Sequence, residues 1–95
     1  MLKIAIIGCG KIADTHATHI QQLPGCELVA VCDSEELMAR QLYERFPARG
    51  YYTDVRTMLE KARPDVVHIT TPPRSHLPIA LLCLEYGCHL FVEKP

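Results

Sequence analysis

The stretch LKIAIIGCGKIA, residues 2–13, decides the fold class of this chain. Residues 2–7 are a short and almost continuous apolar run, which is typical of a strand that is buried on both faces. A glycine-rich turn follows directly, and residues 11–23 then place apolar side chains at helical spacing. A buried strand, a glycine turn and a helix in this order predict the first unit of an α/β fold with a parallel sheet.

The rest of the chain repeats this alternation of short apolar runs and helical segments. We expect further strands at residues 26–32, 49–52, 65–70 and 88–92. We expect further helices at residues 34–46, at residues 53–62 with Thr53 as the cap, and between a capping Ser75 and Gly87. Alternating strands and helices are joined by right-handed crossovers. The pattern therefore predicts a Rossmann-type parallel sheet with strand order 3-2-1-4-5 and helices on both faces.

The composition is that of one ordinary globular domain. The chain has 95 residues and a formal net charge of -1, which gives no electrostatic reason to expect nucleic acid or a membrane as partner. No run is long enough to span a membrane, and the first residues lack a signal-peptide pattern. The five cysteines are scattered, without a C-x-x-C pair. We therefore expect reduced thiols in a cytoplasmic protein, and no metal site.

The predicted topology also locates the ligand site. Open parallel sheets bind ligands at the carboxyl ends of their strands, at the point where the strand order reverses. Here that point lies between the first and fourth strands. The residues expected to face a ligand are those just after each strand: residues 8–13, Asp33, residues 70–76 and residues 93–95.

The loop after the first strand has the pattern G-x-G-x-x-A, formed by Gly8, Gly10 and Ala13. In such a loop the first glycine permits a tight turn, the second lets backbone amides approach a pyrophosphate, and a small third residue allows close helix–strand packing. The helix dipole contributes only about 0.3–2 kcal/mol, so direct amide hydrogen bonds must supply most of the binding. The alternative is a tight turn without a ligand. We interpret Cys9 as a filler that faces the loop, not as a nucleophile.

Asp33 ends the second strand, where an acid can accept hydrogen bonds from the adenosine ribose of a dinucleotide. The alternative is that Asp33 and Glu36 form a capping pair for the second helix, and both roles can coexist. A carboxylate near 4 Å from the 2′-phosphate of NADP repels it by roughly 4 kcal/mol at an effective dielectric of about 20. Arg40, the nearest downstream basic residue, is poorly placed to offset this. We therefore expect a preference for NAD.

Two further motifs make the pattern more specific. Residues 71–76 read TPPRSH and residues 93–95 read EKP, after the fourth and fifth strands. With the glycine loop, Asp33 and the sequence GCHLFV before EKP, they resemble the glucose–fructose oxidoreductase / inositol dehydrogenase / MocA family over the whole chain. The resemblance implies an oxidoreductase that uses NAD or NADP on a sugar, inositol or related polyol.

The resemblance also implies a role for each matching residue. The glycine loop would hold the pyrophosphate, Asp33 the adenosine ribose, the TPPRSH motif the middle of the cofactor, and Glu93 the nicotinamide ribose. Lys94 would contact the substrate hydroxyl or carbonyl as the catalytic residue. The expected cofactor-binding residues are Gly8, Cys9, Gly10, Lys11, Ile12, Ala13, Asp33, Thr71, Pro72, His76 and Glu93.

Several of these residues also have simpler explanations. His76 could be only a first-turn residue of the fourth helix, Thr71-Pro72 only a stiff turn, and Lys94 only a surface lysine. We interpret the other histidines as packed or surface groups, not as ligands; they are His16, His19, His68 and His89. A non-catalytic NAD(P)-binding or sensing module is the alternative function. Lys94 favours the enzyme, because a sensor has no need of a lysine beside the nicotinamide.

The resemblance also predicts what this chain lacks. Members of that family continue past EKP, complete the nucleotide-binding domain and add a second domain with most of the substrate pocket. We therefore expect residues 1–95 to be an incomplete Rossmann domain that is inactive alone. Residues 77–84 are apolar on all sides, so we expect self-association and a homo-oligomeric protein.

Overall fold

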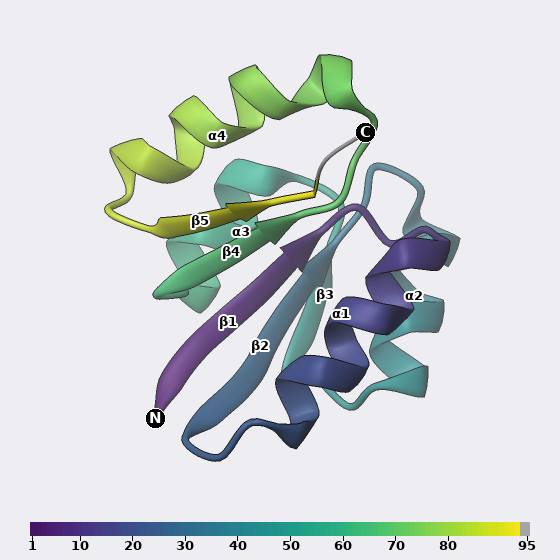
Figure 1. Ribbon diagram of the computed structural model, residues 1–95. Helices are drawn as coiled ribbons and strands as arrows, with labels where there is room; N and C mark the ends of the chain where they lie inside the picture. The colour runs from purple at the N-terminus through teal and green to yellow at the C-terminus, as the bar shows by residue number, and fades with distance from the viewer. Residues whose placement is uncertain (94–95) are drawn as a thin grey trace.

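The computed structural model describes residues 1–93, which form a parallel five-stranded sheet flanked by helices (Figure 1). In chain order the elements are β1 (Leu2–Ile7), α1 (Lys11–Gln22), β2 (Cys26–Cys32), α2 (Glu36–Arg45), β3 (Gly50–Tyr52), α3 (Val55–Ala62), β4 (Val66–Ile69), a 3₁₀ turn (Pro73–Ser75), α4 (His76–Glu85) and β5 (His89–Val92). The strand order is β3-β2-β1-β4-β5, and every neighbouring pair is parallel. The predicted fold class and strand order are confirmed.

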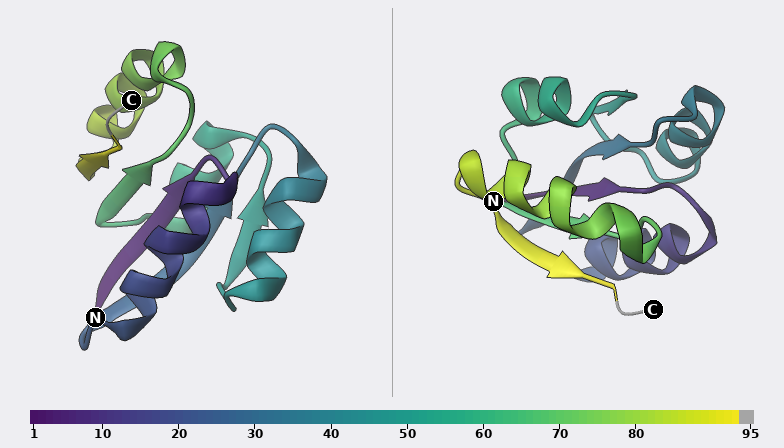
Figure 2. Two further views of the ribbon diagram at one scale, coloured as in Figure 1. Left: turned by 45° about the vertical axis from the view of Figure 1, so that its right-hand side comes forward. Right: turned by 90° about the horizontal axis from the view of Figure 1, so that it is seen from above.

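Alternate side chains of the central strand serve two separate cores. Ile4 and Ile6 of β1 pack with α1 and α2, and Ala5 and Ile7 pack with α3 and α4. Figure 2 shows the helices on both sides of the sheet. Because successive strand residues point to opposite faces, a nearly continuous apolar run is what a doubly covered strand requires. The interpretation of residues 2–7 as a doubly buried strand is therefore confirmed.

The helix starts differ from the prediction in three places. Helix α2 begins at Glu36 and not at residue 34. Thr53 is not the cap of α3; the Oδ2 atom of Asp54 accepts a hydrogen bond from the Thr57 amide at 2.9 Å. Ser75 makes no side-chain cap, because a 3₁₀ turn already holds its backbone in a helical conformation. A capping side chain needs an extended backbone, which Asp54 has and Ser75 lacks.

The glycine turn lies between the ends of β2 and β4 and is hydrogen-bonded to both. The Gly8 amide donates to the Cys32 carbonyl at 2.8 Å, and the Thr70 amide donates to the Ile7 carbonyl at 2.9 Å. Gly8 has φ +98°, and a Cβ atom there would lie 2.8 Å from the Thr71 nitrogen. Only glycine combines this conformation with such a close approach of two backbones. The first glycine of the motif is therefore required by the fold itself.

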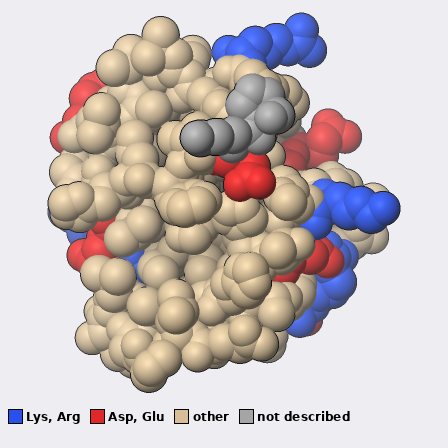
Figure 3. All heavy atoms as spheres, in the orientation of Figure 1, with Lys and Arg blue, Asp and Glu red and all other residues tan. Residues whose placement is uncertain are grey.

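One side of α4 is exposed and apolar. Leu77, Leu81 and Leu84 are 67%, 54% and 56% exposed, and Phe91 of β5 is 51% exposed. Figure 3 shows few charged side chains over this part of the surface. The expectation that this helix is apolar beyond the face it buries is confirmed. Within residues 1–93, no helix combines the length and the hydropathy needed to cross a bilayer.

We predict that Gly8→Ala destabilises the protein by about 3 kcal/mol, because it adds a backbone clash to an unfavourable φ. Gly10→Ala is the matched control, since Gly10 has φ -80° and a Cβ atom there meets nothing within 4 Å. It should change stability by less than about 0.5 kcal/mol. Urea unfolding of both variants measures the difference, and equal losses would contradict the role given to Gly8.

Candidate functional site

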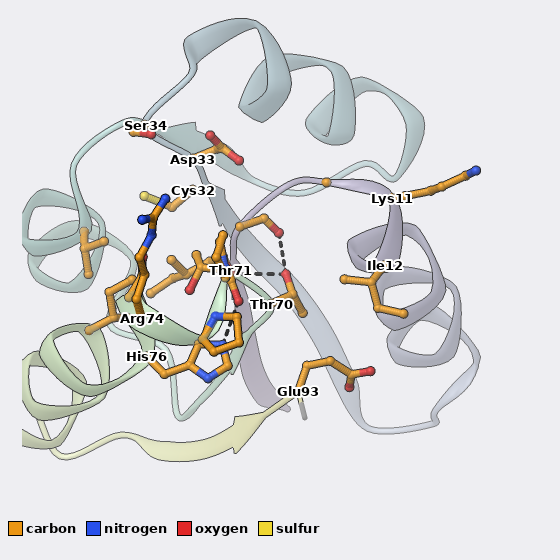
Figure 4. A pocket seen from close by; sticks show the side chains of 18 of the residues that line it. Lys11, Ile12, Cys32, Asp33, Ser34, Thr70, Thr71, Arg74, His76 and Glu93 are labelled. Atoms are coloured by element: carbon orange, nitrogen blue, oxygen red, sulfur yellow. Dashed lines mark hydrogen bonds between the residues drawn. The ribbon is translucent and has the colours of Figure 1, made fainter. Parts of the chain in front are cut away.

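A cleft of about 910 Å³ opens at the carboxyl ends of the strands, across the β1–β4 boundary where the strand order reverses (Figure 4). Its volume is in the range of sites for small organic ligands. Nine of the predicted site residues line it: Gly8, Gly10, Lys11, Ile12, Asp33, Thr71, Pro72, His76 and Glu93. Cys9 and Ala13 do not line it, and Lys94 lies outside the described residues. A cleft thus lies where the topology predicted a ligand site, and the binding roles of its residues stay predictions.

The N-terminus of α1 has the features of an anion site. Gly10 is the N-cap residue and makes no side-chain cap, so no side chain at that position occupies the first amides of the helix. Gly10, Lys11 and Ile12 line the cleft, while the Lys11 side chain extends away from its centre in Figure 4. Free amides and the positive end of the helix dipole suit a phosphate group. The groups available to an anion here are backbone amides, the kind of group that the motif predicts.

A buried hydroxyl near this turn also lacks a partner. The Oγ1 atom of Thr71 is buried and has no hydrogen-bond partner among the described residues. Buried hydroxyl groups are nearly always satisfied, so a bound ligand or a water molecule is expected to supply the missing partner. With the uncapped helix, this atom shows that the residues present fit a polar, phosphate-bearing cofactor.

The side chain of Cys9 points into the core, and the interpretation that it faces the loop is wrong. Cys9 is 1% exposed and packs in the core beneath α1, and its Sγ atom contacts the Cys32 carbonyl at 3.4 Å. The turn at Gly8 redirects the chain, so the strand's alternation no longer predicts which way the next side chain points. Burial, with the nearby charge of Asp33, raises the pKa of the Cys9 thiol to about 12. That pKa agrees with the inference that Cys9 is not a nucleophile.

Ala13 is fully buried against the sheet, so its role in this structure is packing. A small side chain at this position lets the first turn of α1 approach β1 closely, as the motif predicts. Ala13 therefore affects the site only through the position of the first turn of α1 relative to β1.

Asp33 connects two loops at the rim of the cleft. Its Oδ2 atom accepts a hydrogen bond from the Cys9 amide, and its Oδ1 atom accepts one from the Glu35 amide, both at 2.8 Å. The proposed capping pair with Glu36 does not form, because Asp33 bonds the amide two residues along and Glu35 is the N-cap residue. An ionised carboxylate offers about four acceptor positions, so capacity for ribose hydroxyls remains.

The TPPRSH motif is held in place by two side chains, one from Thr70 just before it and one from His76 within it. The Thr70 hydroxyl bonds the Gly8 carbonyl at 2.5 Å, which fixes the motif against the glycine turn. The His76 Nε2 atom lies 2.6 Å from the Thr71 carbonyl oxygen, and a carbonyl only accepts, so Nε2 carries a hydrogen. His76 is both the first residue of α4 and a lining residue of the cleft. Its place in the first turn of α4 is confirmed, and its contact with a cofactor stays a prediction.

Arg74 is a lining residue whose role the sequence analysis missed. It lines the same cleft as Cys32 and Ser34, and its side chain points in their direction in Figure 4. Arg40 is the nearest basic residue downstream of Asp33 in the sequence, whereas Arg74 is distant in sequence and lines the same cleft. Arg74 lies within residues 70–76, which the sequence analysis expected to face the ligand, and this position could have identified it. Arg74 adds a positive charge to the cleft that Asp33 also lines.

A pair of histidines lies beneath the β5 end of the cleft. The Nδ1 atoms of His16 and His68 are 2.9 Å apart, and the His16 Nε2 atom is 3.2 Å from the Glu93 Oε2 atom. Burial, with the neighbouring His16, lowers the pKa of His68 to about 4. The interpretation of both residues as packed groups agrees with their burial, but the contact between His16 and Glu93 was not foreseen. Within residues 1–93, no three potential metal ligands are grouped to hold an ion.

Comparison with known proteins identifies the family. Residues 2–95 match the model of the GFO_IDH_MocA oxidoreductase family, described as an NAD-binding Rossmann fold. The chain belongs to this family. Two of the motifs by which the sequence resembles this family are the glycine loop and TPPRSH. Residues of both motifs line one cleft in the structure.

Individual family members are similar over the whole chain. A D-glucoside 3-dehydrogenase of Escherichia coli K12 is 42% identical over 95 residues, which cover 99% of this chain and 27% of the relative. A glycosyl hydrolase family 109 protein of Akkermansia muciniphila is 32% identical over 103 residues, covering 99% of this chain and 22% of the relative. The structure of a scyllo-inositol dehydrogenase from Lactobacillus casei with bound NAD(H) and scyllo-inositol aligns with a TM-score of 0.91 and 28% identity, covering 100% of this chain and 28% of that one. This chain thus spans about a quarter of the length of such relatives.

We predict that His68 makes the protein less stable as the pH falls from about 6.5 to about 4. Its pKa is lowered from 6.5 to about 4, so in this window the unfolded chain binds a proton that the folded chain does not. Above the window the residue is neutral in both states, and below it the effect is constant. Urea midpoints at pH 7.5 and pH 5 should differ more for the unsubstituted protein than for His68→Gln. Equal pH sensitivity of the two proteins would refute the prediction.

Proposed function

We propose that this chain is the cofactor-binding domain of a dehydrogenase that transfers hydride between a nicotinamide cofactor and a hydroxyl or carbonyl carbon of a sugar, inositol or related polyol. One observation carries the proposal: an uncapped helix N-terminus and an acidic strand end face the same cleft. These are the two groups that recognise a dinucleotide's diphosphate and ribose. The sugar and inositol dehydrogenases among the relatives support the substrate class.

Each part of the cleft has a task in this proposal. The amides of Gly10, Lys11 and Ile12 bind the pyrophosphate, and Asp33 accepts hydrogen bonds from the adenosine ribose. The TPPRSH loop lies along the middle of the cofactor. Glu93, after β5, accepts a hydrogen bond from the nicotinamide ribose. The bound cofactor supplies or accepts the hydride, and the protein orients it and the substrate.

The acid–base step is assigned to Lys94, which lies outside the described residues. In the sequence it directly follows Glu93, the residue proposed to bind the nicotinamide ribose. A lysine ammonium can donate a hydrogen bond to the substrate oxygen and exchange a proton with it. A non-catalytic sensing module has no use for this group, which is why we favour the enzyme.

NAD is the proposed cofactor, in preference to NADP. The Asp33 carboxylate opposes a 2′-phosphate by roughly 4 kcal/mol if the charges approach to about 4 Å. The positive charge of Arg74, which lines the same cleft, works against this discrimination. Asp33 is fixed by two backbone amides, so it cannot readily turn away from the ribose. We therefore propose that the acid dominates the choice.

The substrate is proposed to bind mainly to a further domain of the protein. The relatives are about four times the length of this chain. In this proposal residues 1–95 form an incomplete Rossmann domain that does not turn over substrate alone. We place the protein in the cytoplasm, since its buried cysteines are free thiols.

We predict that the full-length protein binds NADH more tightly than NADPH, and that Gly10→Ala weakens NADH binding about tenfold or more. A Cβ atom at Gly10 leaves the fold intact but pushes the diphosphate away, and a hydrogen bond to a charged group is worth about 1.5–3 kcal/mol. Fluorescence titration measures both dissociation constants, and turnover on a panel of sugars and polyols tests the reaction. Failure to bind either cofactor would overturn the proposal, and tighter NADPH binding would reverse the cofactor preference.

We propose that the exposed apolar side of α4 makes this chain self-associate and contributes to a homo-oligomer in the whole protein. The mean mass from light scattering should rise with concentration, and Leu81→Glu should suppress the rise. Leu37→Glu is the matched control, because Leu37 is 55% exposed on α2, away from this surface. A constant monomer mass at all concentrations would contradict the prediction.

A further inference from the structure

We propose that His16 is a positioning residue for the cofactor site: it holds one carboxylate oxygen of Glu93, so that the other oxygen is presented to the nicotinamide ribose. This inference rests on the proposed function. It assigns a role to a buried histidine that does not line the cleft.

The first step is the contact itself, which joins two distant parts of the chain. His16 is 8% exposed on α1, the helix that begins at the glycine loop. Glu93 follows β5, and its amide donates to the Ile69 carbonyl at 3.0 Å. Its backbone is thus fixed by β4, and its Oε2 atom is held by the His16 Nε2 atom at 3.2 Å. The contact links the pyrophosphate end of the proposed site to the nicotinamide end.

The second step is the direction of the hydrogen bonds. An ionised carboxylate only accepts, so the His16 Nε2 atom carries a hydrogen. The facing Nδ1 atoms of His16 and His68 need one hydrogen between them. Either His68 donates to a neutral His16, or a doubly protonated His16 donates to His68. In both arrangements His16 donates to Glu93, so the geometry assigns one direction to this bond.

The third step is the packing that fixes the His16 ring. The ring meets His68 edge-on with centroids 5.1 Å apart, and it meets Phe91 in a similar way at 5.6 Å. His68 in turn stacks on Phe91 at 5.0 Å. A ring held by two neighbours and engaged at both nitrogens has little rotational freedom. It can therefore select one rotamer of a glutamate that otherwise has several.

The fourth step connects the selected rotamer to the ligand. The Glu93 side chain is 36% exposed and lines the cleft, and His16 is its only side-chain hydrogen-bond partner within residues 1–93. Ordering a free glutamate on binding costs conformational entropy, whereas a glutamate that is already ordered binds without that cost. Removing the His16 donor should therefore weaken cofactor binding without removing any atom that touches the cofactor.

The test compares two replacements of His16 in the full-length protein, with the dissociation constant for NADH as the readout. The amide of His16→Gln reaches about as far as Nε2 and keeps the donor to Glu93. The asparagine of His16→Asn is shorter: it keeps a polar group toward His68 but loses the hydrogen bond to Glu93. We expect His16→Asn to raise the dissociation constant about five- to tenfold. We expect His16→Gln to stay within about twofold of the unsubstituted protein, and His19→Asn, exposed on the same helix, to have no effect.

A double-substitution cycle separates positioning from packing. In a Glu93→Gln background, His16→Asn should cause little further loss of NADH affinity, since its effect passes through the carboxylate. Additive losses, or equal losses in His16→Asn and His16→Gln, would overturn the positioning role while leaving the proposed function intact. Absence of NADH binding by the unsubstituted protein would instead overturn the proposed function, and this inference with it.

A measurement without substitutions covers the case in which His16→Asn does not fold. Nitrogen-15 NMR of the histidine rings reports the hydrogen-bond state of each ring nitrogen. Binding of NADH should shift the Nε2 signal of His16 and leave the signals of the exposed His19 in place. An unchanged His16 signal at saturating NADH would refute the inference.

Discussion

The site depends on one contact between two backbones, at Gly8. This residue lies so close to Thr70 and Thr71 that the ends of β1 and β4 behave as one unit. The glycine loop and the TPPRSH loop diverge from this point, one toward α1 and the other toward α4. The gap between them is the cleft. A larger residue at Gly8 would separate the two loops, so the requirement for glycine is structural before it is chemical.

Asp33 connects the end of β2 to the linked ends of β1 and β4. Its two carboxylate oxygens bond the amides of Cys9 and Glu35, which belong to different crossovers. The acid proposed to recognise the ribose is therefore also the group that sets the distance from the glycine loop to the end of β2. A rigid acid discriminates between ligands better than a mobile one, because it cannot relax away from an unfavourable charge. The local structure and the proposed cofactor preference thus depend on the same two hydrogen bonds.

Local patterns were sufficient for the strand order and for the location of the cleft. The apolar run at residues 2–7, the glycine loop and the strand ends are each visible within a dozen residues of sequence. Contacts between distant residues were not visible. His16 and Glu93 are 77 residues apart, and nothing near either one indicates the other. Arg74 lies in a loop that was expected to face the ligand, but the sequence did not show that its charge shares a cleft with Asp33.

Other predictions failed because the sequence does not specify the local backbone conformation. Thr53 and Asp54 are both good capping residues, and the extended backbone at Asp54 decides between them. The direction of Cys9 depends on the dihedral angles of the glycine before it. Such choices are made by backbone geometry, which the identity of the side chains does not specify.

The two edge strands of the sheet, β3 and β5, differ in length and exposure, so a further strand would pair more readily with one edge than with the other. Strand β3 has three residues, all half-buried, whereas β5 has four and leaves His89, Phe91 and Val92 exposed. A short edge offers few backbone groups to an incoming strand, and a longer exposed edge offers a template for pairing. Any polypeptide that extends this sheet should therefore add beside β5, next to Glu93 and the nicotinamide end of the proposed site. An added strand would change the surroundings of Glu93 and leave the adenosine end untouched.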